Sequence, residues 1–245
     1  MSINVSTRAA PAGRETGRGK VVEVTHFSDV LCVWAYISEV RIDALKRKFG
    51  NSLQLTYRFC SVFGDTAGKI TSAWKGKGEY DGFNSHLRHV AERFPHIEIH
   101  PAIWLKTQPA SSASPHLFLK AVQQWEQKSG QPAGEASYFE RATSALRRAF
   151  FRDCRDISCW NVQCETAHSV GADIDAIEKL IDSGAAFARL TADYQDAEKM
   201  RIEGSPSMVL NEGRQKFYGN VGFRVIDANI QELLREPRAD DASWC

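Results

Sequence analysis

Residues 28–36 read SDVLCVWAY and join a predicted strand to a predicted helix. Before them, residues 20–27 (KVVEVTHF) alternate and are rich in β-branched side chains, which indicates a strand. After Trp34, apolar residues recur at helical spacing up to Phe49, and Gly50 follows as a typical stop signal. We therefore expect Cys32 to lie where a strand ends and a helix begins.

The segments on either side extend this pattern to a small sheet. Residues 53–59 (LQLTYRF) alternate again, so the chain opens as strand, helix, strand, which is expected to be parallel and right-handed. Near the other end, residues 207–211 and 214–218 flank a Glu212–Gly213 hairpin turn, and residues 223–234 form an amphipathic helix.

The middle of the chain is expected to be helical, after a Gly- and Lys-rich loop at residues 64–80. Segments that fit a helical period are 83–94, 115–127, 135–152, 158–170, 174–182 and 185–201. The predicted organisation has a disordered tail (1–20), a core formed by 21–60 and 201–236, and a loop and helical insertion domain at 61–200.

Composition limits the classes of function. The 245 residues contain 31 Lys and Arg against 30 Asp and Glu, and 43% are hydrophobic, as in a globular protein. Collagen-like, coiled-coil and wholly disordered chains are excluded. Without excess positive charge, no nucleic-acid partner is expected. We see no signal-peptide or membrane-spanning pattern, so we expect a cytoplasmic location and no membrane contact.

The six cysteines do not form a recognisable framework. No Cys-x-x-Cys pair occurs, and thiols of a cytoplasmic protein stay mostly reduced. Cys154, Cys159 and Cys164 recur every five residues, a spacing that scatters them around a helix. We therefore expect no metal site.

Cys32 is the candidate nucleophile. A thiol at a helix N-terminus faces unpaired N–H groups and the positive end of the helix dipole, which both favour the thiolate. This predicts that Cys32 is the most acidic of the six thiols. The alternative is a small, inert core residue, because free cysteines are often buried. His26 could donate to the thiolate, but a half-buried strand histidine is the simpler interpretation.

A second feature is Gly204-Ser205-Pro206, just before a predicted strand. Proline is tolerated at the head of a strand, where its missing N–H costs no ladder bond. A cis Ser205–Pro206 bond would leave the Ser205 backbone free to pair with an extended ligand. We predict that this bond is cis; an ordinary trans loop is the alternative.

Together these features resemble the DsbA-like thioredoxin family over about residues 20 to 236, in a cytosolic bacterial branch related to 2-hydroxychromene-2-carboxylate isomerases and kappa-class glutathione transferases. The resemblance rests on Phe27-Ser28-Asp29, Cys32-Val33-Trp34-Ala35-Tyr36, Gly204-Ser205-Pro206 and Tyr218-Gly219-Asn220. It implies an α/β thioredoxin fold (β-α-β … β-β-α) with a large helical insertion. It also implies a catalytic Cys32, with Trp34, Ser205 and Pro206 binding substrate.

The chain departs from the family's Cys-x-x-Cys motif, because Ala35 stands at the fourth position and Val33 at the second. No disulfide can form within the motif, which excludes a DsbA-type dithiol mechanism. The expected activity is thiol–disulfide exchange through Cys32 alone. No bound cofactor is expected; glutathione is a candidate co-substrate, the partner is a small thiol or protein disulfide, and a homodimer is a further expectation.

Cys60 follows the second predicted strand, at the same sheet edge as Cys32, because parallel strands end on one side. It is either a displaced resolving thiol or a structural cysteine. Two other functions remain open. One is a glutathione-dependent isomerase or transferase, although the turn Gly219-Asn220-Val221-Gly222 lacks the acid typical of those relatives. The other is a non-catalytic binding module that uses Trp34.

Overall fold

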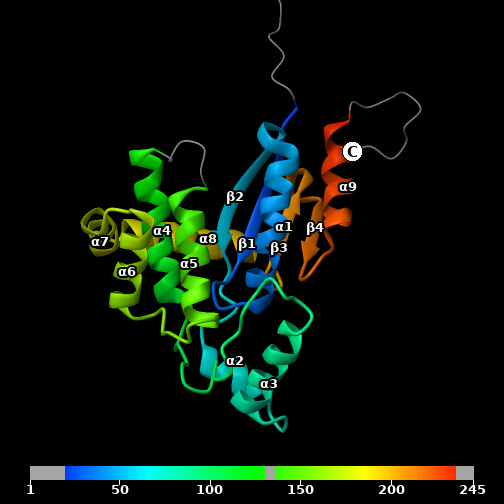
Figure 1. Cartoon of the computed structure of the whole chain (residues 1–245). Helices are drawn as coiled ribbons and strands as arrows, with labels where there is room; N and C mark the ends of the chain where they lie inside the picture. Colours follow the sequence, from blue (N-terminus) through cyan, green and yellow to red (C-terminus); the bar gives the residue numbers. More distant parts are fainter. Residues whose placement is uncertain (1–19, 131–135, 236–245) are drawn as a thin grey trace, which may run out of the picture.

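A four-stranded mixed sheet forms the centre of the molecule in the computed structural model, which describes residues 20–130 and 136–235 (Figure 1). Its strands are β1 (Val22–Ser28), β2 (Leu53–Phe59), β3 (Ser207–Leu210) and β4 (Gln215–Tyr218), in the order β2-β1-β3-β4. β1 is parallel to β2, whereas β3 is antiparallel to both β1 and β4. The predicted α/β thioredoxin topology is therefore confirmed; the predicted tail, except Lys20, lies outside the described residues.

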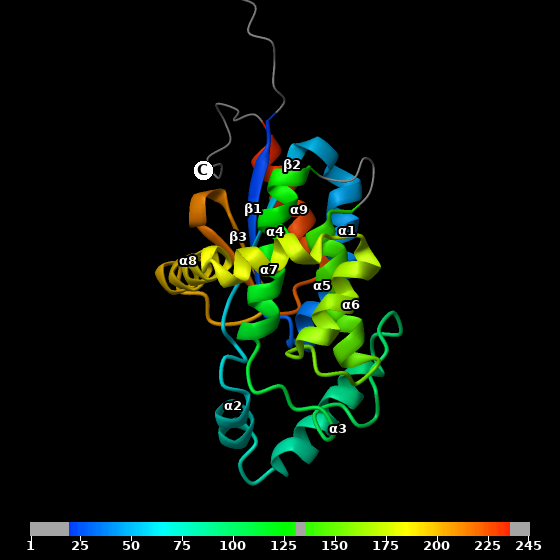
Figure 2. The ribbon, with the colours of Figure 1, turned by 90° about the vertical axis from the view of Figure 1, so that its left-hand side faces the viewer.

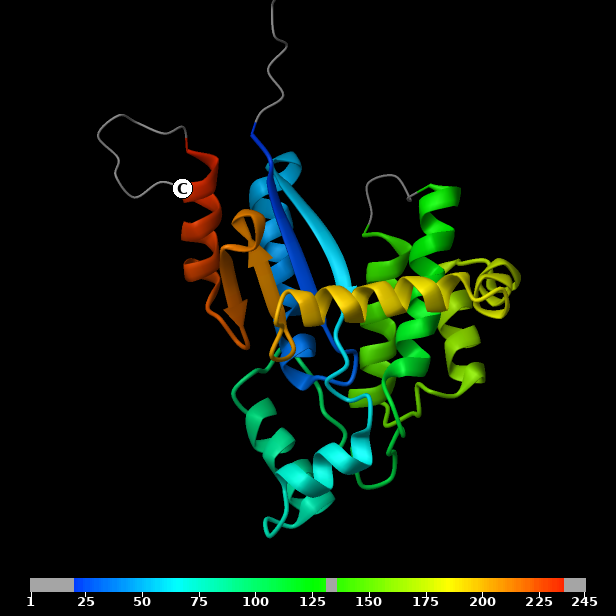
Figure 3. The same cartoon turned by 180° about the vertical axis from the view of Figure 1, so that it is seen from behind.

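Helices cover both faces of this sheet. On one face, Val24 packs with Ile42 of α1 (Val33–Phe49) and Ile226 of α9 (Phe223–Leu234). On the other face, Phe27 packs with Ala197 of α8 (Ala185–Lys199), which crosses the strands in Figure 3. This alternation of β1 side chains follows the strand period of two residues. Short 3-10 turns, η1 (Gly50–Ser52) and η2 (Asn211–Gly213), precede β2 and β4.

The insertion between β2 and β3 is helical, as predicted. Besides α8, it contains α2 (Thr66–Ala73), α3 (Glu79–Ala91), α4 (Ala113–Ser129), α5 (Tyr138–Phe151), α6 (Trp160–Val170) and α7 (Ile174–Asp182). Figure 1 shows α4–α7 beside the sheet, and Figures 1 and 2 both show the α2–α3 pair beyond the end of the strands. A continuous core, which includes Trp104, Phe118 and Phe150, joins the insertion to the start of α1.

The predicted loop at residues 64–80 is wrong in part, because α2 lies within it. The helix begins after Asp65, whose carboxylate accepts a hydrogen bond from the Gly68 N–H (2.9 Å). Its Ile70 side chain is buried in the core. An N-cap and one apolar anchor stabilise a helix that the Gly- and Lys-rich composition concealed. Similarly, α5 begins after Ser137, which forms a capping box with Glu140.

A buried ion pair joins the insertion to β2. Asp193 of α8 accepts a hydrogen bond from the Phe59 N–H (3.0 Å) and lies 2.8 Å from the Lys120 ammonium. Both side chains are buried, and burial lowers the pKa of Lys120 even though Asp193 opposes that shift. Arg58 of β2 also reaches Asp193 (3.3 Å) and, at 2.6 Å, the more exposed Asp196.

We predict that Asp193→Asn lowers the free energy of unfolding by about 3–5 kcal/mol, because it leaves the buried Lys120 without its counter-charge. Asp196→Asn is the matched control. It removes a pair with the same Arg58 near the surface and should cost about 1 kcal/mol or less. Urea unfolding of both variants measures the difference; equal losses would contradict a structural role for the buried pair.

Candidate active site

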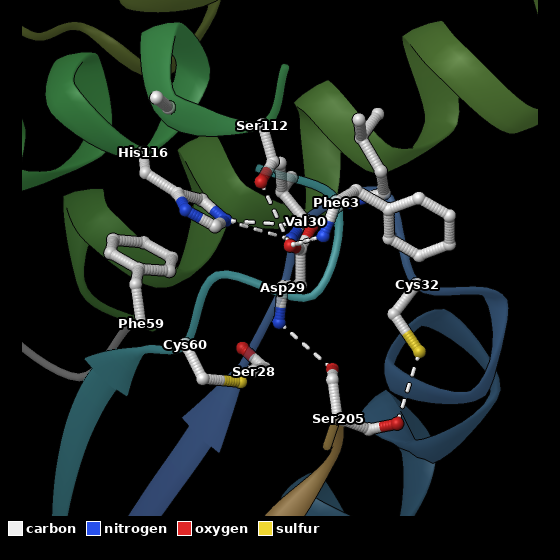
Figure 4. A network of polar contacts seen from close by, with 12 residues as sticks. Ser28, Asp29, Val30, Cys32, Phe59, Cys60, Phe63, Ser112, His116 and Ser205 are labelled. Atoms are coloured by element: carbon white, nitrogen blue, oxygen red, sulfur yellow. Dashed lines mark hydrogen bonds and ion pairs between the residues drawn. The ribbon is translucent and has the colours of Figure 1, made fainter. Parts of the chain in front are cut away.

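Cys32 is the N-cap residue of α1, directly after the turn that follows β1. Its backbone is extended (φ −83°, ψ 118°), and the helix begins at Val33, one residue before the predicted start at Trp34. The side chain is only 6% exposed, and its Sγ atom lies 3.1 Å from the Ser205 carbonyl oxygen, to which the thiol donates (Figure 4). The candidate nucleophile therefore contacts the loop before β3, which is 173 residues away in the chain.

That loop contains the predicted cis bond between Ser205 and Pro206. The Ser205 hydroxyl oxygen accepts a hydrogen bond from the Asp29 N–H (2.8 Å), so side chain and carbonyl of one residue both meet the β1–α1 turn. Gly204 precedes them because a Cβ atom there would lie 2.7 Å from the Tyr218 ring. The predicted cis bond is therefore confirmed, and the loop that contains it lies against Cys32.

Asp29 has a role that sequence reasoning missed. Its carboxylate is completely buried and accepts hydrogen bonds from the Leu31 N–H (2.9 Å), the Phe63 N–H (2.8 Å) and the Ser112 hydroxyl (2.8 Å). These donors belong to the β1–α1 turn, the segment after β2 and the start of α4. The carboxylate therefore joins three segments beside Cys32 (Figure 4).

His116 of α4 approaches the Asp29 carboxylate at 3.7 Å, but the two do not form an ion pair. The Val30 N–H donates to Nε2 of His116 (3.0 Å), so this nitrogen carries no proton. The other nitrogen, Nδ1, faces the Tyr194 hydroxyl at 3.0 Å and is assigned the proton. Burial lowers the pKa of His116 to about 4, which agrees with a neutral ring. Asp29 therefore depends on hydrogen-bond donors, without a cation from His116.

The expected acidity of Cys32 is wrong for this structure. Burial raises the pKa of the Cys32 thiol above its ordinary value, and the negative charge of Asp29 adds to the rise. The helix N-terminus is present as predicted, but its stabilisation of a thiolate is outweighed by the loss of water around the sulfur. The sequence pattern located the helix but contained no information on how deeply the sulfur is buried.

Cys60 lies against the same loop before β3 that Cys32 contacts. It follows β2, its N–H donates to the Ser28 carbonyl (3.2 Å), and its Sγ atom lies 3.9 Å from the Gly204 carbonyl oxygen. The two thiols thus point at consecutive carbonyl groups of the loop. They do not form a disulfide with each other. Burial raises the pKa of Cys60 as well.

Trp34 is half-buried, and its ring meets the edge of the Phe94 ring at 6.0 Å. Phe94 lies in the segment that follows α3, so this tryptophan joins α1 to the insertion. Its contact with substrate stays a prediction. Ser112, His116 and Tyr194 were missed, because no short-range pattern connects them to a motif more than eighty positions away.

Within residues 20–130 and 136–235, no group of three or more His, Cys, Asp or Glu side chains could hold a metal ion. In the same part of the chain, no helix is both long and apolar enough to span a bilayer.

Fold and site define a thioredoxin-fold protein with a cysteine opposite a cis-proline loop. A family model, the DSBA-like thioredoxin domain, matches residues 23–231. The chain therefore belongs to this DsbA-like family of thiol–disulfide oxidoreductases. No curated protein sequence matches the chain.

Solved structures confirm the fold at low sequence identity. A putative protein disulfide isomerase from Nitrosomonas europaea has a TM-score of 0.67 at 13% identity, covering 87% of this chain and 99% of that one. A 2-hydroxychromene-2-carboxylate isomerase has a TM-score of 0.59 at 18% identity, and the match covers 86% of this chain and 95% of that one. The cytosolic disulfide reductase DsbM from Pseudomonas aeruginosa, solved with GSH, has a TM-score of 0.61 at 14% identity. This match covers 85% of this chain and 99% of that one.

The pKa of Cys32 predicts how its reactivity changes with pH. The rate of alkylation by iodoacetamide should rise with pH in the native protein with a midpoint above that of the same cysteine in urea-unfolded chain, because burial favours the thiol. Peptide mapping after timed labelling measures both midpoints. A native midpoint below the unfolded one would show that the helix dipole dominates.

The Asp29 carboxylate gives a second prediction. Asp29→Asn should lower the Cys32 midpoint, because a negative charge is removed, and should destabilise the fold by about 1–3 kcal/mol, because an amide cannot accept all three donors. Ser112→Ala is the control, since it removes one donor and keeps the charge. If both variants lower the midpoint equally, the charge of Asp29 is not the cause.

Proposed function

We propose that the protein catalyses thiol–disulfide exchange through Cys32 alone, without a second cysteine in the motif. The observation that carries the proposal is the Cys32 sulfur held 3.1 Å from the Ser205 carbonyl, beside the cis Pro206. The fourth motif position is a fully buried Ala35, so the neighbouring helical turn offers no thiol.

The reaction has two steps. Cys32 loses its proton, and the thiolate attacks one sulfur of a disulfide; a mixed disulfide forms and the other half leaves as a thiolate, which takes up a proton. An external thiol then attacks the mixed disulfide, releases Cys32 and carries away the first half as a new disulfide. Glutathione is the proposed external thiol, in a cytoplasmic location, and a GSH-bound disulfide reductase with this fold supports the choice.

Substrate binding has to change the contact between Cys32 and Ser205. In the resting protein the Cys32 thiol donates a hydrogen bond to the Ser205 carbonyl oxygen. Once the sulfur carries a mixed disulfide it has no proton to donate, so this carbonyl can accept a backbone N–H from an extended substrate. We propose that Ser205 and Pro206 bind substrate in this way and that Trp34 borders the same surface.

Glutathione disulfide tests the proposal. The native protein should gain the mass of one glutathione on the Cys32 peptide and should turn over a small disulfide in the presence of glutathione. Cys32→Ser should abolish both. Cys159→Ser, which changes an exposed thiol, should change neither. Disulfide turnover that persists in Cys32→Ser would contradict the assignment.

Cys60 is the alternative resolving thiol, favoured by its place on the adjacent carbonyl Gly204. It would attack the mixed disulfide, form a Cys32–Cys60 bond and release glutathione. Its burial and raised pKa favour the external thiol instead. Cys60→Ser should therefore turn over like the parent. A large loss of turnover, together with a Cys32–Cys60 peptide after diamide treatment of the parent, would reverse this choice.

The second candidate function is glutathione transfer or isomerisation. The fold shared with 2-hydroxychromene-2-carboxylate isomerase is consistent with it. Conjugation of glutathione to chlorodinitrobenzene that survives Cys32→Ser would support this function over disulfide exchange.

Ala35→Cys predicts a gain of function. Ala35 lies one helical turn from Cys32 and its N–H donates to the Cys32 carbonyl (3.1 Å), so the new thiol would lie within reach of the first. The variant should form an intramotif disulfide and reduce insulin with dithiothreitol faster than the parent. Ala35→Ser adds similar bulk without a thiol and should show no gain; equal rates in both would contradict the prediction.

A further inference from the structure

A cavity of about 480 Å³ lies between β1, β2, α1 and α5. Neither Cys32 nor the loop before β3 lines it, so it is separate from the site proposed for disulfide exchange. It reaches the surface beside Asp43 of α1 and Arg148 of α5, which are both exposed. A cavity of this volume is large enough to hold a small organic ligand.

His26 of β1 is a buried part of the cavity wall. Its side chain is only 3% exposed, and neither ring nitrogen has a hydrogen-bond partner among the described residues. Burial, with a contribution from the charge of Arg147, lowers the pKa of His26 to about 3, so the ring is neutral and presents one donor and one acceptor. Polar groups buried to this degree normally have partners, so the ring indicates a polar occupant of the cavity.

Arg147 of α5 adds a second unpaired group at the same place. Its terminal nitrogens donate to Glu39 Oε1 (2.8 Å) and to Ser28 Oγ (3.2 Å), but its buried Nε atom has no partner in the described part of the chain. Ser28 lies two residues after His26 on the same face of β1, so the Nε atom and the His26 ring belong to one end of the cavity. The unpaired groups at this end are two N–H donors and one nitrogen acceptor.

The charges around the cavity do not call for an ionic ligand. Each buried or half-buried charged side chain that lines it already has a partner: Arg147 with Glu39 (2.8 Å), Glu140 with Lys46 (2.6 Å), Arg58 with Asp196 (2.6 Å), and Arg141 with the Val170 carbonyl (2.9 Å). The two exposed charges at its mouth, Asp43 and Arg148, have opposite signs. The wall therefore fits a neutral ligand.

The shape of the wall indicates a saturated carbon frame. Phe139 packs against both Phe59 and Tyr57, with ring centroids 6.0 and 5.5 Å apart, so no slot for a flat ring is open between these side chains. The rest of the apolar wall is aliphatic and consists of Ala35, Ile42, Ala145 and Val170. Aliphatic groups of this kind pack well on the C–H groups of a ligand that is not planar.

We propose that this cavity binds a small neutral polyol with a saturated carbon frame. One hydroxyl oxygen accepts a hydrogen bond from Arg147 Nε, and a neighbouring hydroxyl group bonds to a nitrogen of His26. Because a hydroxyl group both donates and accepts, adjacent hydroxyls suit either tautomer of the ring. The carbon frame lies against Ile42 and Val170. This site adds a ligand to the protein whatever thiol chemistry Cys32 performs.

The probe is cis-cyclohexane-1,2-diol, and cyclohexanol and cyclohexanecarboxylate are its matched counterparts. NMR titration of the full chain, labelled with ¹⁵N, should show saturable binding of the diol and should move the signals of the His26 ring and of Arg147 Nε. The diol should bind about fivefold or more tighter than cyclohexanol, which leaves one buried group unpaired. It should also bind tighter than the carboxylate, because burial of an uncompensated charge is costly.

Two pairs of variants locate the site. His26→Phe keeps a flat ring without nitrogen, and Arg147→Lys keeps the charge opposite Glu39 but removes the Nε donor; each should weaken diol binding about fivefold or more. The matched controls are His89→Phe in α3 and Arg148→Lys in α5, which change exposed side chains and should leave binding unchanged. Circular dichroism and the urea midpoint show that each variant is folded. The signals in the native protein test the same contacts without a substitution.

Each other outcome overturns the proposal. Absence of saturable binding means that the cavity holds only water. Binding that leaves the His26 and Arg147 signals unmoved, or that both cavity variants retain, places the diol elsewhere. Equal affinity for diol and cyclohexanol shows that the unpaired nitrogens do not recognise adjacent hydroxyls, and tighter binding of the carboxylate shows that the cavity selects an anion.

Discussion

The active site depends on one buried carboxylate. Asp29 accepts hydrogen bonds from the turn before α1, from the segment after β2 and from the start of α4. Its own N–H donates to Ser205, so the cis-proline loop is joined to the same residue. A buried carboxylate without a donor set of this kind would be very costly, and the surrounding segments are therefore held in one arrangement.

This arrangement explains why Cys32 is protected in the resting protein. The thiol is confined between the β1–α1 turn and Ser205, where water is scarce and a nearby negative charge opposes ionisation. In the proposed reaction, a substrate has to displace the contact between Cys32 and Ser205.

The sequence predicted those features that arise from local pattern. Strand alternation, helical spacing and the hairpin turn gave β1, α1, β2, β3, β4 and α9, and the Cys32 and Ser205–Pro206 motifs identified the two sides of the site. It failed where the result depends on distant packing. Burial raises the pKa of Cys32, whereas the sequence pattern predicted a lowered pKa. His116 accepts a hydrogen bond from the Val30 N–H, but it lies in a helix without a recognisable motif. The helix α2 was missed because its composition is unfavourable for a helix. The Asp65 N-cap and the buried Ile70 stabilise it nevertheless.

The strand order has a consequence for synthesis of the chain. β1 lies between β2 and β3, and Cys32 is covered by a residue 173 positions later. During translation the first two strands and α1 leave the ribosome long before Ser205 is synthesised. For most of that time, Ser205 does not cover Cys32. The burial that raises the thiol pKa is complete only once the loop before β3 contacts the sulfur. The sulfur of the candidate nucleophile is therefore open to oxidants in an emerging chain and is protected in the completed fold.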